Sequence, residues 1–306
     1  KSKKKVSFGY PGTGIEFKIV GKEVKLIIQD ETQGGEQHTD YLSVEINGNV
    51  DSVLMLKNQR STYDISKLLI EDTSEVRIIK RTETSVGVFS FFGIKIENNS
   101  KLIPYETKKH KTLWIGDSFM CGYGNELSTS PPPDGNPNTG FHAVNENNYL
   151  SWSSIVSRAF DTEDHQICYS GKGIFRNFDD SKTETIPLIF DRSIPSEYYS
   201  GTWNHQSFIP ELIVIALGTN DFGPEMTDNT NLIDSTQFVT TYLKFINKLQ
   251  SNYPNSKIVL ITGNALTDFW PAGLKRLTRS RNYNKVCKQY ASNPHAISTF
   301  ELTSQI

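Results

Sequence analysis

Cysteine is scarce in this chain of 306 residues, which holds only Cys121, Cys168 and Cys287. Three cysteines cannot all pair, and none stands in a C-x-x-C motif, so we expect neither a disulfide framework nor a zinc site. Cys121 and Cys168 fall near the ends of neighbouring predicted strands. One disulfide between them and two buried free thiols are equally open interpretations.

Long apolar runs and an excess of one charge are also missing. No stretch approaches the roughly 20 apolar residues that cross a bilayer, so we predict no membrane span. The net charge is −2, and the only basic cluster is residues 1–5, which gives no reason to expect a nucleic-acid partner. The first residue is Lys rather than Met, from which we expect that a leader or tag was removed and that the protein is secreted or at the cell surface. The oligomeric state is not indicated.

What the chain does contain is enough length for two domains, with 36% hydrophobic and 22% charged residues. In residues 1–107, short segments rich in β-branched and aromatic residues alternate with turn residues. Regularly spaced strands without helical periods predict an antiparallel β-sandwich of jelly-roll type. The predicted strands are 15–20, 23–30, 41–48, 52–57, 75–81 and 87–97.

From residue 108 to residue 306 apolar runs alternate with helical periods. This pattern predicts a three-layer α/β domain whose loops carry function at the carboxyl ends of parallel strands. A segment rich in Pro, Gly and Asn, 128–147, is expected to form a rim beside the active site. The predicted strands are 113–115, 167–169, 212–217, 257–261 and 295–300, and the predicted helices are 149–160, 235–250 and 274–290.

The second domain opens on LWIGDSFMCGYGNE (113–126), a strand that runs into a tight turn with Ser118 at its tip. Gly171 follows the second predicted strand and Asn220 the third. Acyl transfer needs a nucleophilic hydroxyl, a base for its proton and donors aimed at the oxyanion. Ser118 offers the hydroxyl, while its own N–H, the Gly171 N–H and the Asn220 amide offer the donors. We expect Asp117 and Asp221 to fix the adjoining turns by hydrogen bonds.

The motifs GDSFMCGYG, YSGKG and LGTND resemble blocks I, II and III of the SGNH (GDSL-type) hydrolase superfamily, over about residues 109–306. With a β-sandwich before it, WIGDSFMCGYGNE is similar to carbohydrate esterase family 2. The resemblance implies a flavodoxin-like hydrolase domain with Ser118 as nucleophile and Ser118, Gly171 and Asn220 as the oxyanion hole. Gly173 is the alternative to Gly171. The implied activity is that of an acetyl xylan esterase-like serine esterase, which removes acetyl groups from xylan or glucomannan without a metal or organic cofactor.

One part of the superfamily pattern is missing, namely the late D-x-x-H block that supplies the base. None of the six histidines has Asp or Glu three residues before it, so we expect the catalytic histidine to lie in a segment absent from this chain, beyond Ile306. His142, in the rim segment, and His205, before the third strand, are weaker alternatives. We do not expect a catalytic role for the remaining histidines, which are His38, His110, His165 and His295.

The partner expected from the resemblance is an acetylated polysaccharide or oligosaccharide. Tyr123, Trp203 and Trp270 are candidates for stacking on its pyranose rings, with core packing as the alternative. Two other functions stay open. One is a lipase or thioesterase acting on a different ester, and the other is a glycan-binding module on an esterase fold that has lost turnover.

Overall fold

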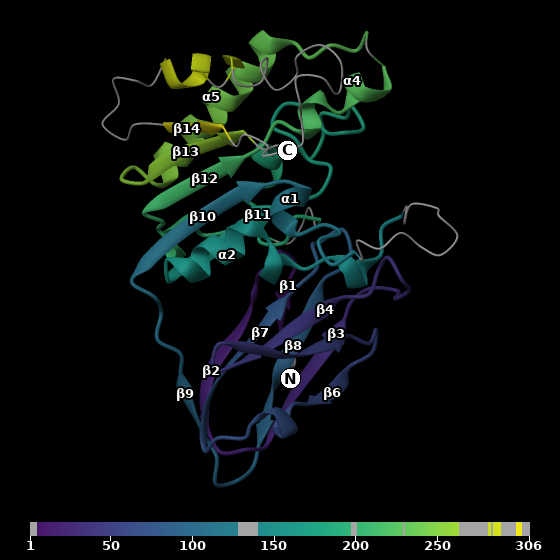
Figure 1. Ribbon diagram of the computed structural model, residues 1–306, viewed down its shortest axis with the longest axis vertical. Helices are drawn as coiled ribbons and strands as arrows, with labels where there is room; N and C mark the ends of the chain where they lie inside the picture. The colour runs from purple at the N-terminus through teal and green to yellow at the C-terminus, as the bar shows by residue number, and fades with distance from the viewer. Residues whose placement is uncertain are drawn as a thin grey trace. The chain divides into compact units, whose positions relative to one another are not determined.

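The computed structural model describes residues 5–127, 140–196, 201–228, 230–262, 281–282, 284–288 and 298–301. The chain forms two compact units (Figure 1). The first unit comprises Lys1–Thr107, Cys121–Val156 and Ile194–Tyr198, and the second comprises Lys108–Met120, Ser157–Ser193 and Tyr199–Ile306. Among the described residues, no helix is both long and apolar enough to cross a membrane.

The first unit contains two antiparallel sheets, which confirms the predicted β-sandwich. The first sheet has the order β1-β8-β3-β6, with the bounds Val6–Phe8, Phe89–Ile96, Val24–Asp30 and Ser61–Asp64. The second sheet has the order β5-β4-β7-β2-β9, with the bounds Asn49–Met55, Tyr41–Ile46, Thr73–Lys80, Gly14–Val20 and Lys101–Pro104.

Alternating side chains build the core of this sandwich. Along β3, Val24, Leu26 and Ile28 are fully buried, and the residues between them are half-buried. This is the period of two that the sequence shows, since successive side chains of a strand point to opposite faces. Each fully buried aliphatic side chain contributes about 1.5–3 kcal/mol. Other members of the same core are Ile19, Leu42, Val44, Val76, Ile78 and Phe89.

The second unit is built on one parallel sheet, as predicted, with the order β11-β10-β12-β13-β14. Its central strands are apolar because a parallel sheet of this kind is buried on both faces. The indole Nε1 of Trp114 donates to Ser157 Oγ at 2.8 Å and so joins β10 to α2 (Trp152–Ala159). The strand bounds are Thr162–Cys168 (β11), His110–Gly116 (β10), Leu212–Ala216 (β12), Lys257–Thr262 (β13) and Ser298–Glu301 (β14).

The longest described helix is α5 (Ser235–Asn252), which lies against the parallel sheet (Figure 1). Asp234 caps it, accepting from Thr236 N and Gln237 N. Its buried side chains recur with helical spacing and are Phe238, Tyr242, Phe245, Ile246 and Leu249. The other helices are α1 (Ser118–Cys121), α2 (Trp152–Ala159), α3 (Ile186–Ile189) and α4 (Pro224–Thr227). The short 3-10 helices are η1 (Ser66–Leu68), η2 (Ala143–Asn145), η3 (Asn148–Leu150), η4 (His205–Ser207) and η5 (Asn220–Phe222).

Several predicted elements differ from the structure in their limits, and β11 shows the physical reason most clearly. β11 begins at Thr162, whereas the sequence predicted a strand starting at 167. The added residues, TEDHQ, are mostly charged or polar, which an edge strand tolerates because its open side faces water. Of the predicted helix 274–290, residues 281–282 and 284–288 are described and are helical.

Candidate active site

The first site segment is the turn between β10 and α1. Gly116 ends the strand, and a Cβ at this position would lie 2.8 Å from Met120 Cβ, so only glycine fits without a shift. Asp117 is buried, and its Oδ1 accepts from Phe119 N at 3.2 Å. Its carbonyl accepts from Met120 N at 3.0 Å. Asp117 therefore fixes the turn as expected, and Ser118, which is partly exposed, begins the helix.

The second site segment follows β11 and contains two glycines with different roles. Gly171 has φ +76°, a left-handed conformation that favours glycine, and its Cβ position is open within 4 Å. Gly173 is enclosed, because an added Cβ would lie 2.0 Å from the Arg176 carbonyl oxygen. The Gly173 N–H donates to Asn177 Oδ1 at 3.2 Å. Among the described residues, we find no acceptor for the Gly171 N–H.

The third site segment follows β12 and contains η5. Asn220 begins this helix and is 6% exposed. Its Nδ2 donates to the Lys172 carbonyl at 2.9 Å, which ties the third segment to the second. A side-chain amide has two N–H donors, so this bond leaves one of them for another acceptor.

Asp221 strengthens the same connection. Its carboxylate is fully buried and accepts the backbone N–H groups of residues 174, 175 and 176 at 3.0, 2.7 and 3.0 Å. Burial raises the pKa of Asp221, while the three N–H donors oppose that shift. The Asp221 carboxylate also accepts from its own backbone N–H, which fits the expectation that it helps to fix its own turn, but most of its bonds go elsewhere. It holds the segment after β11, because the two turns face each other across the end of the sheet.

Arg176 is a residue of this network that sequence reasoning missed. It is 3% exposed, and its Nε donates to the Asp221 carbonyl at 2.7 Å. Its guanidinium also donates to Asn231 Oδ1 at 2.7 Å and to Asp180 Oδ1 at 3.1 Å. The only signal in the sequence is a lone cation within GIFRNF, which does not reveal that the side chain is buried.

The three segments leave neighbouring strands at the same level of the sheet. β10 lies between β11 and β12 (Figure 1), and Gly116 pairs with Cys168 on one side and with Ala216 on the other. The strands are parallel, so all three chains turn at the carboxyl edge, where ligands bind in open α/β sheets. Ser118, Gly171 and Asn220 thus follow three adjacent strand ends.

The described histidines of the second unit do not follow the carboxyl end of a strand. His110 opens β10, about 20 Å from the end of that strand by the rise per residue. His165 lies inside β11, paired with Leu113, and not before the strand as predicted. It stacks on Phe208 with ring centroids 3.6 Å apart, and burial lowers the pKa of His165 to about 4.

His205, an alternative base from the sequence, has both ring nitrogens in hydrogen-bond contacts. Nδ1 lies 2.8 Å from the Tyr253 hydroxyl, and Nε2 lies 2.9 Å from Asp191 Oδ1. The other alternative, His142, belongs to the first unit, where its Nδ1 lies 3.3 Å from Glu36 Oε2. His38 is also in the first unit, and His295 lies outside the described residues.

The aromatic candidates for sugar stacking have different surroundings. Trp203 is half-buried and meets the ring of His165 edge-on at 5.5 Å, a packing contact beside the middle of β11. Tyr123, in the first unit, is 46% exposed and stacks on Phe141 at 4.8 Å. Trp270 lies outside the described residues. Their role in substrate binding stays a prediction.

The sequence left open whether Cys121 and Cys168 form a disulfide or stay as two buried thiols. Cys121 and Cys168 are both buried and both free, so they do not form a disulfide with each other.

Comparison with known proteins gives two family matches. Residues 1–105 match the N-terminal domain of carbohydrate esterase 2, and residues 114–302 match the GDSL-like lipase/acylhydrolase family. The cellulase/esterase CelE of Acetivibrio thermocellus is 31% identical over 87% of this chain, and the chain spans 30% of CelE. An acetylxylan esterase / glucomannan deacetylase of Cellvibrio japonicus is 24% identical over 84% of this chain and 67% of that protein.

Solved structures agree with these matches. A family two carbohydrate esterase from Clostridium thermocellum, solved in complex with cellohexaose, has a TM-score of 0.84 at 26% identity and covers 98% of this chain and 85% of its own. A family two carbohydrate esterase from Cellvibrio japonicus shares the fold, with a TM-score of 0.83 at 21% identity over 98% of this chain and 82% of its own. The chain therefore belongs to the GDSL-like lipase/acylhydrolase family and, within it, to carbohydrate esterase family 2.

Proposed function

We propose that this chain is a carbohydrate O-acetyl esterase that removes acetyl groups from plant polysaccharides such as xylan or glucomannan. The observation that carries the proposal is the arrangement of Ser118, Gly171 and Asn220 after three adjacent parallel strands. The Cellvibrio japonicus relative, an acetylxylan esterase / glucomannan deacetylase, supports the substrate class. Such substrates lie outside the cell, so we expect the protein to be secreted or at the cell surface.

In this mechanism the Ser118 Oγ attacks the acetyl carbonyl carbon while a base takes its proton. The resulting oxyanion accepts from the N–H groups of Ser118 and Gly171 and from the Nδ2 hydrogen of Asn220 that Lys172 does not use. The base then protonates the sugar oxygen as it leaves. Water, deprotonated by the same base, attacks the acetyl-enzyme and releases acetate.

Gly171 suits the oxyanion hole better than Gly173. The Gly173 N–H donates to Asn177 Oδ1, and its surroundings leave no room for a Cβ, so its role is to let the loop pack. Gly171 has open space around its Cβ position, and this allows a substrate to approach the backbone closely.

The base in this proposal is a histidine from outside the described residues. Among the described histidines of the second unit, His110 opens a strand, His165 lies within one and His205 uses both ring nitrogens. Free imidazole offers a test, because it can replace a missing histidine side chain as proton acceptor. We therefore expect imidazole to raise acetyl release by this chain if the base is absent from it.

The test measures acetate release from acetylated xylan, and p-nitrophenol release from p-nitrophenyl acetate, with and without imidazole. We expect imidazole to raise the rate of ester hydrolysis by the wild-type chain. With Ser118→Ala, the rate should equal that of imidazole alone in buffer without protein. Equal rates for the two proteins under every condition would refute Ser118 as the nucleophile. Long-chain p-nitrophenyl esters serve as the control for a lipase, which would prefer them to the acetate.

Glycan binding without turnover is a second candidate, because the Clostridium thermocellum structure was solved in complex with cellohexaose. Affinity electrophoresis in gels containing xylan or glucomannan measures binding alone. This second function would be favoured if the gel retards both the wild type and Ser118→Ala and neither protein releases acetate, even with imidazole. Acetate release that depends on Ser118 would favour the esterase.

A further inference from the structure

Outside the candidate active site, three side chains with metal-binding atoms meet in the interior of the first unit. They are Glu83, which follows β7, Cys121, which ends α1, and Glu146, which follows η2. Their exposed fractions are 1%, 0% and 0%. One ligand atom from each lies within 4.8 Å of the other two. Clusters of acidic groups are common on surfaces, but this one is fully enclosed.

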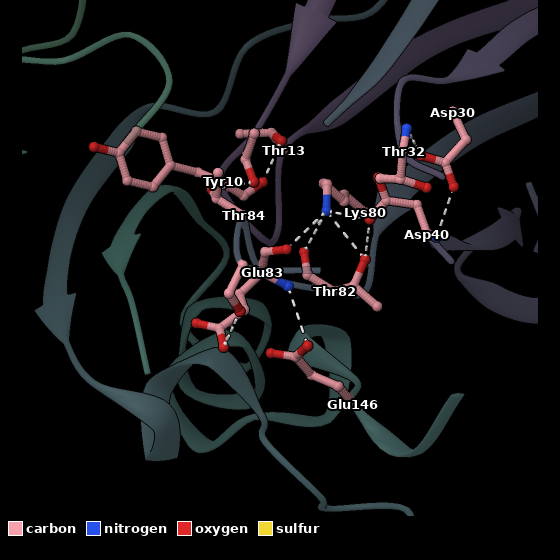
Figure 2. A network of polar contacts seen from close by, with 12 residues as sticks. Tyr10, Thr13, Asp30, Thr32, Asp40, Lys80, Thr82, Glu83, Thr84 and Glu146 are labelled. Atoms are coloured by element: carbon pink, nitrogen blue, oxygen red, sulfur yellow. Dashed lines mark hydrogen bonds and ion pairs between the residues drawn. The ribbon is translucent and has the colours of Figure 1, made fainter. Parts of the chain in front are cut away.

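The contacts within the cluster leave one oxygen unsatisfied. Cys121 Sγ lies 3.3 Å from Glu83 Oε2, and Ser85 Oγ donates to Glu83 Oε1 at 2.7 Å. The Glu83 N–H donates to Glu146 Oε2 at 3.2 Å, a bond drawn in Figure 2. Glu146 Oε1 is buried and has no hydrogen-bond partner among the described residues. A buried carboxyl oxygen without a partner is costly, and it calls for a proton or a cation.

The basic side chain of this network, Lys80, forms its ion pair with another carboxylate and not with Glu146. The ammonium of Lys80 is fully buried and pairs with Asp40 Oδ1 at 2.5 Å. It also donates to Thr82 O at 2.7 Å and to the Glu83 carbonyl at 3.3 Å, as Figure 2 shows. The charge of Lys80 is therefore balanced by Asp40. Among the described residues, Glu146 forms no ion pair with a basic side chain, and its Oε1 stays without a hydrogen bond.

We propose that Glu83, Cys121 and Glu146 form a structural binding site for a divalent cation that accepts sulfur, with zinc as the best match. Zinc is held by thiolate and carboxylate ligands at about 2.3 and 2.1 Å, so neighbouring S and O ligands of a tetrahedron are about 3.6 Å apart. The 3.3 Å between Cys121 Sγ and Glu83 Oε2 is close to that spacing. Calcium and magnesium prefer ligand sets made only of oxygen, which the thiol argues against.

Zinc binding at this site balances in charge and protons. Zinc binds the thiolate of Cys121 and the carboxylates of Glu83 and Glu146, so any proton that these groups carry without metal is released on binding. Three anionic ligands and one dication leave a single negative charge. Burial and the charge of Glu83 raise the pKa of Glu146 well above its usual value, while Lys80 opposes that shift and Asp40 adds to it. Protons therefore compete with zinc, and zinc affinity should rise with pH.

The site differs from the zinc motifs that a sequence reveals. Cys121 and Glu146 lie 38 and 63 residues beyond Glu83, and only folding brings the three together. The absence of a C-x-x-C pair therefore excludes common zinc motifs but not this one. The proposal does not depend on esterase activity.

The test produces the full chain without a His tag in zinc-supplemented medium, so that metal is present while the buried site forms. After purification without chelator and desalting, elemental analysis should find about one zinc per chain in the wild type. Protein made in cobalt-supplemented medium should show the absorption of thiolate-to-cobalt charge transfer. Wild-type protein without bound metal in both preparations would overturn the proposal.

Two variants and one matched control assign the ligands. Cys121→Ser should lose the metal and the cobalt absorption, whereas Cys168→Ser, at another buried free cysteine, should keep both. Glu146→Gln keeps an oxygen for the Glu83 N–H but loses the negative charge, so its zinc affinity should fall about tenfold or more. If Cys121→Ser does not fold, the zinc content of Glu146→Gln decides whether this cluster binds the metal. Zinc retained equally by Glu146→Gln and the wild type would show that the metal binds elsewhere.

Discussion

The carboxylate of Asp221 should control both the stability and the turnover of the second unit, and Asp221→Asn tests this. Its Oδ1 accepts from Phe175 N and Arg176 N, and its Oδ2 accepts from Ile174 N. An asparagine keeps one acceptor oxygen and turns the other position into an N–H₂ donor. One backbone N–H would then face a donor in a site with no access to water.

The magnitude follows from these bonds. Losing one bond to a buried charged group costs about 1.5–3 kcal/mol, and the two remaining bonds weaken by about 1 kcal/mol each when the acceptor becomes neutral. We therefore expect Asp221→Asn to lower the free energy of unfolding of this unit by about 4 kcal/mol. Because Gly171 and Asn220 adjoin the held segment, kcat should fall as well, with a smaller change in KM.

The assay is urea unfolding monitored by tryptophan fluorescence, paired with initial rates on p-nitrophenyl acetate in the presence of imidazole. Asp234→Asn is the matched control, because Asp234 also accepts two backbone N–H bonds but lies exposed at the start of α5. Asparagine caps helices as well as aspartate does, so this variant should behave like the wild type. A loss below about 1 kcal/mol for Asp221→Asn would contradict the assigned hydrogen bonds. An unchanged kcat in a folded variant would contradict its positioning role.

Two other predictions test the proposed oxyanion donor Asn220 and the half-buried His165. Asn220→Ala should lower kcat on p-nitrophenyl acetate about 100- to 1,000-fold, the usual loss for one oxyanion donor. A decrease of less than threefold in kcat, relative to wild type, would remove Asn220 from that role. The pKa of His165 is lowered to about 4, so the folded state excludes a proton that the unfolded state takes up below about 6.5. Stability is thus full above that pH and is lost as pH falls toward 4, by about 2 kcal/mol at pH 5. His165→Gln should lose correspondingly less free energy of unfolding than the wild type between pH 7 and pH 5, and equal losses would refute the burial argument.

The common edge of the candidate site could be predicted from the sequence. Each of the apolar runs before Ser118, Gly171 and Asn220 stops at a glycine or a small polar turn residue. In a doubly wound sheet, such ends meet on one side. The β-sandwich could be predicted equally well, because strands such as β3 alternate between buried and half-buried residues along their length.

Contacts between distant segments could not be predicted in this way. The Asp221 carboxylate reaches backbone groups 45–47 residues earlier, and nothing local in the sequence marks those groups as its donors. β11 was predicted too short for a related reason. Its first residues are polar because it is an edge strand, and the periodicity of a buried strand does not apply there.

The position of Asn220 next to Asp221 links a proposed oxyanion donor to the loop after β11 that faces it. The Asn220 side chain donates to the Lys172 carbonyl, and the Asp221 side chain accepts from the three residues that follow Gly173. The turn after β12 therefore bonds to the turn after β11 on both sides of Gly173. In the Ser118 turn, Phe119 N donates to the Asp117 side chain and Met120 N to the Asp117 carbonyl. Gly171 and Asn220, the two proposed oxyanion donors outside the Ser118 turn, thus stand on turns that hold each other.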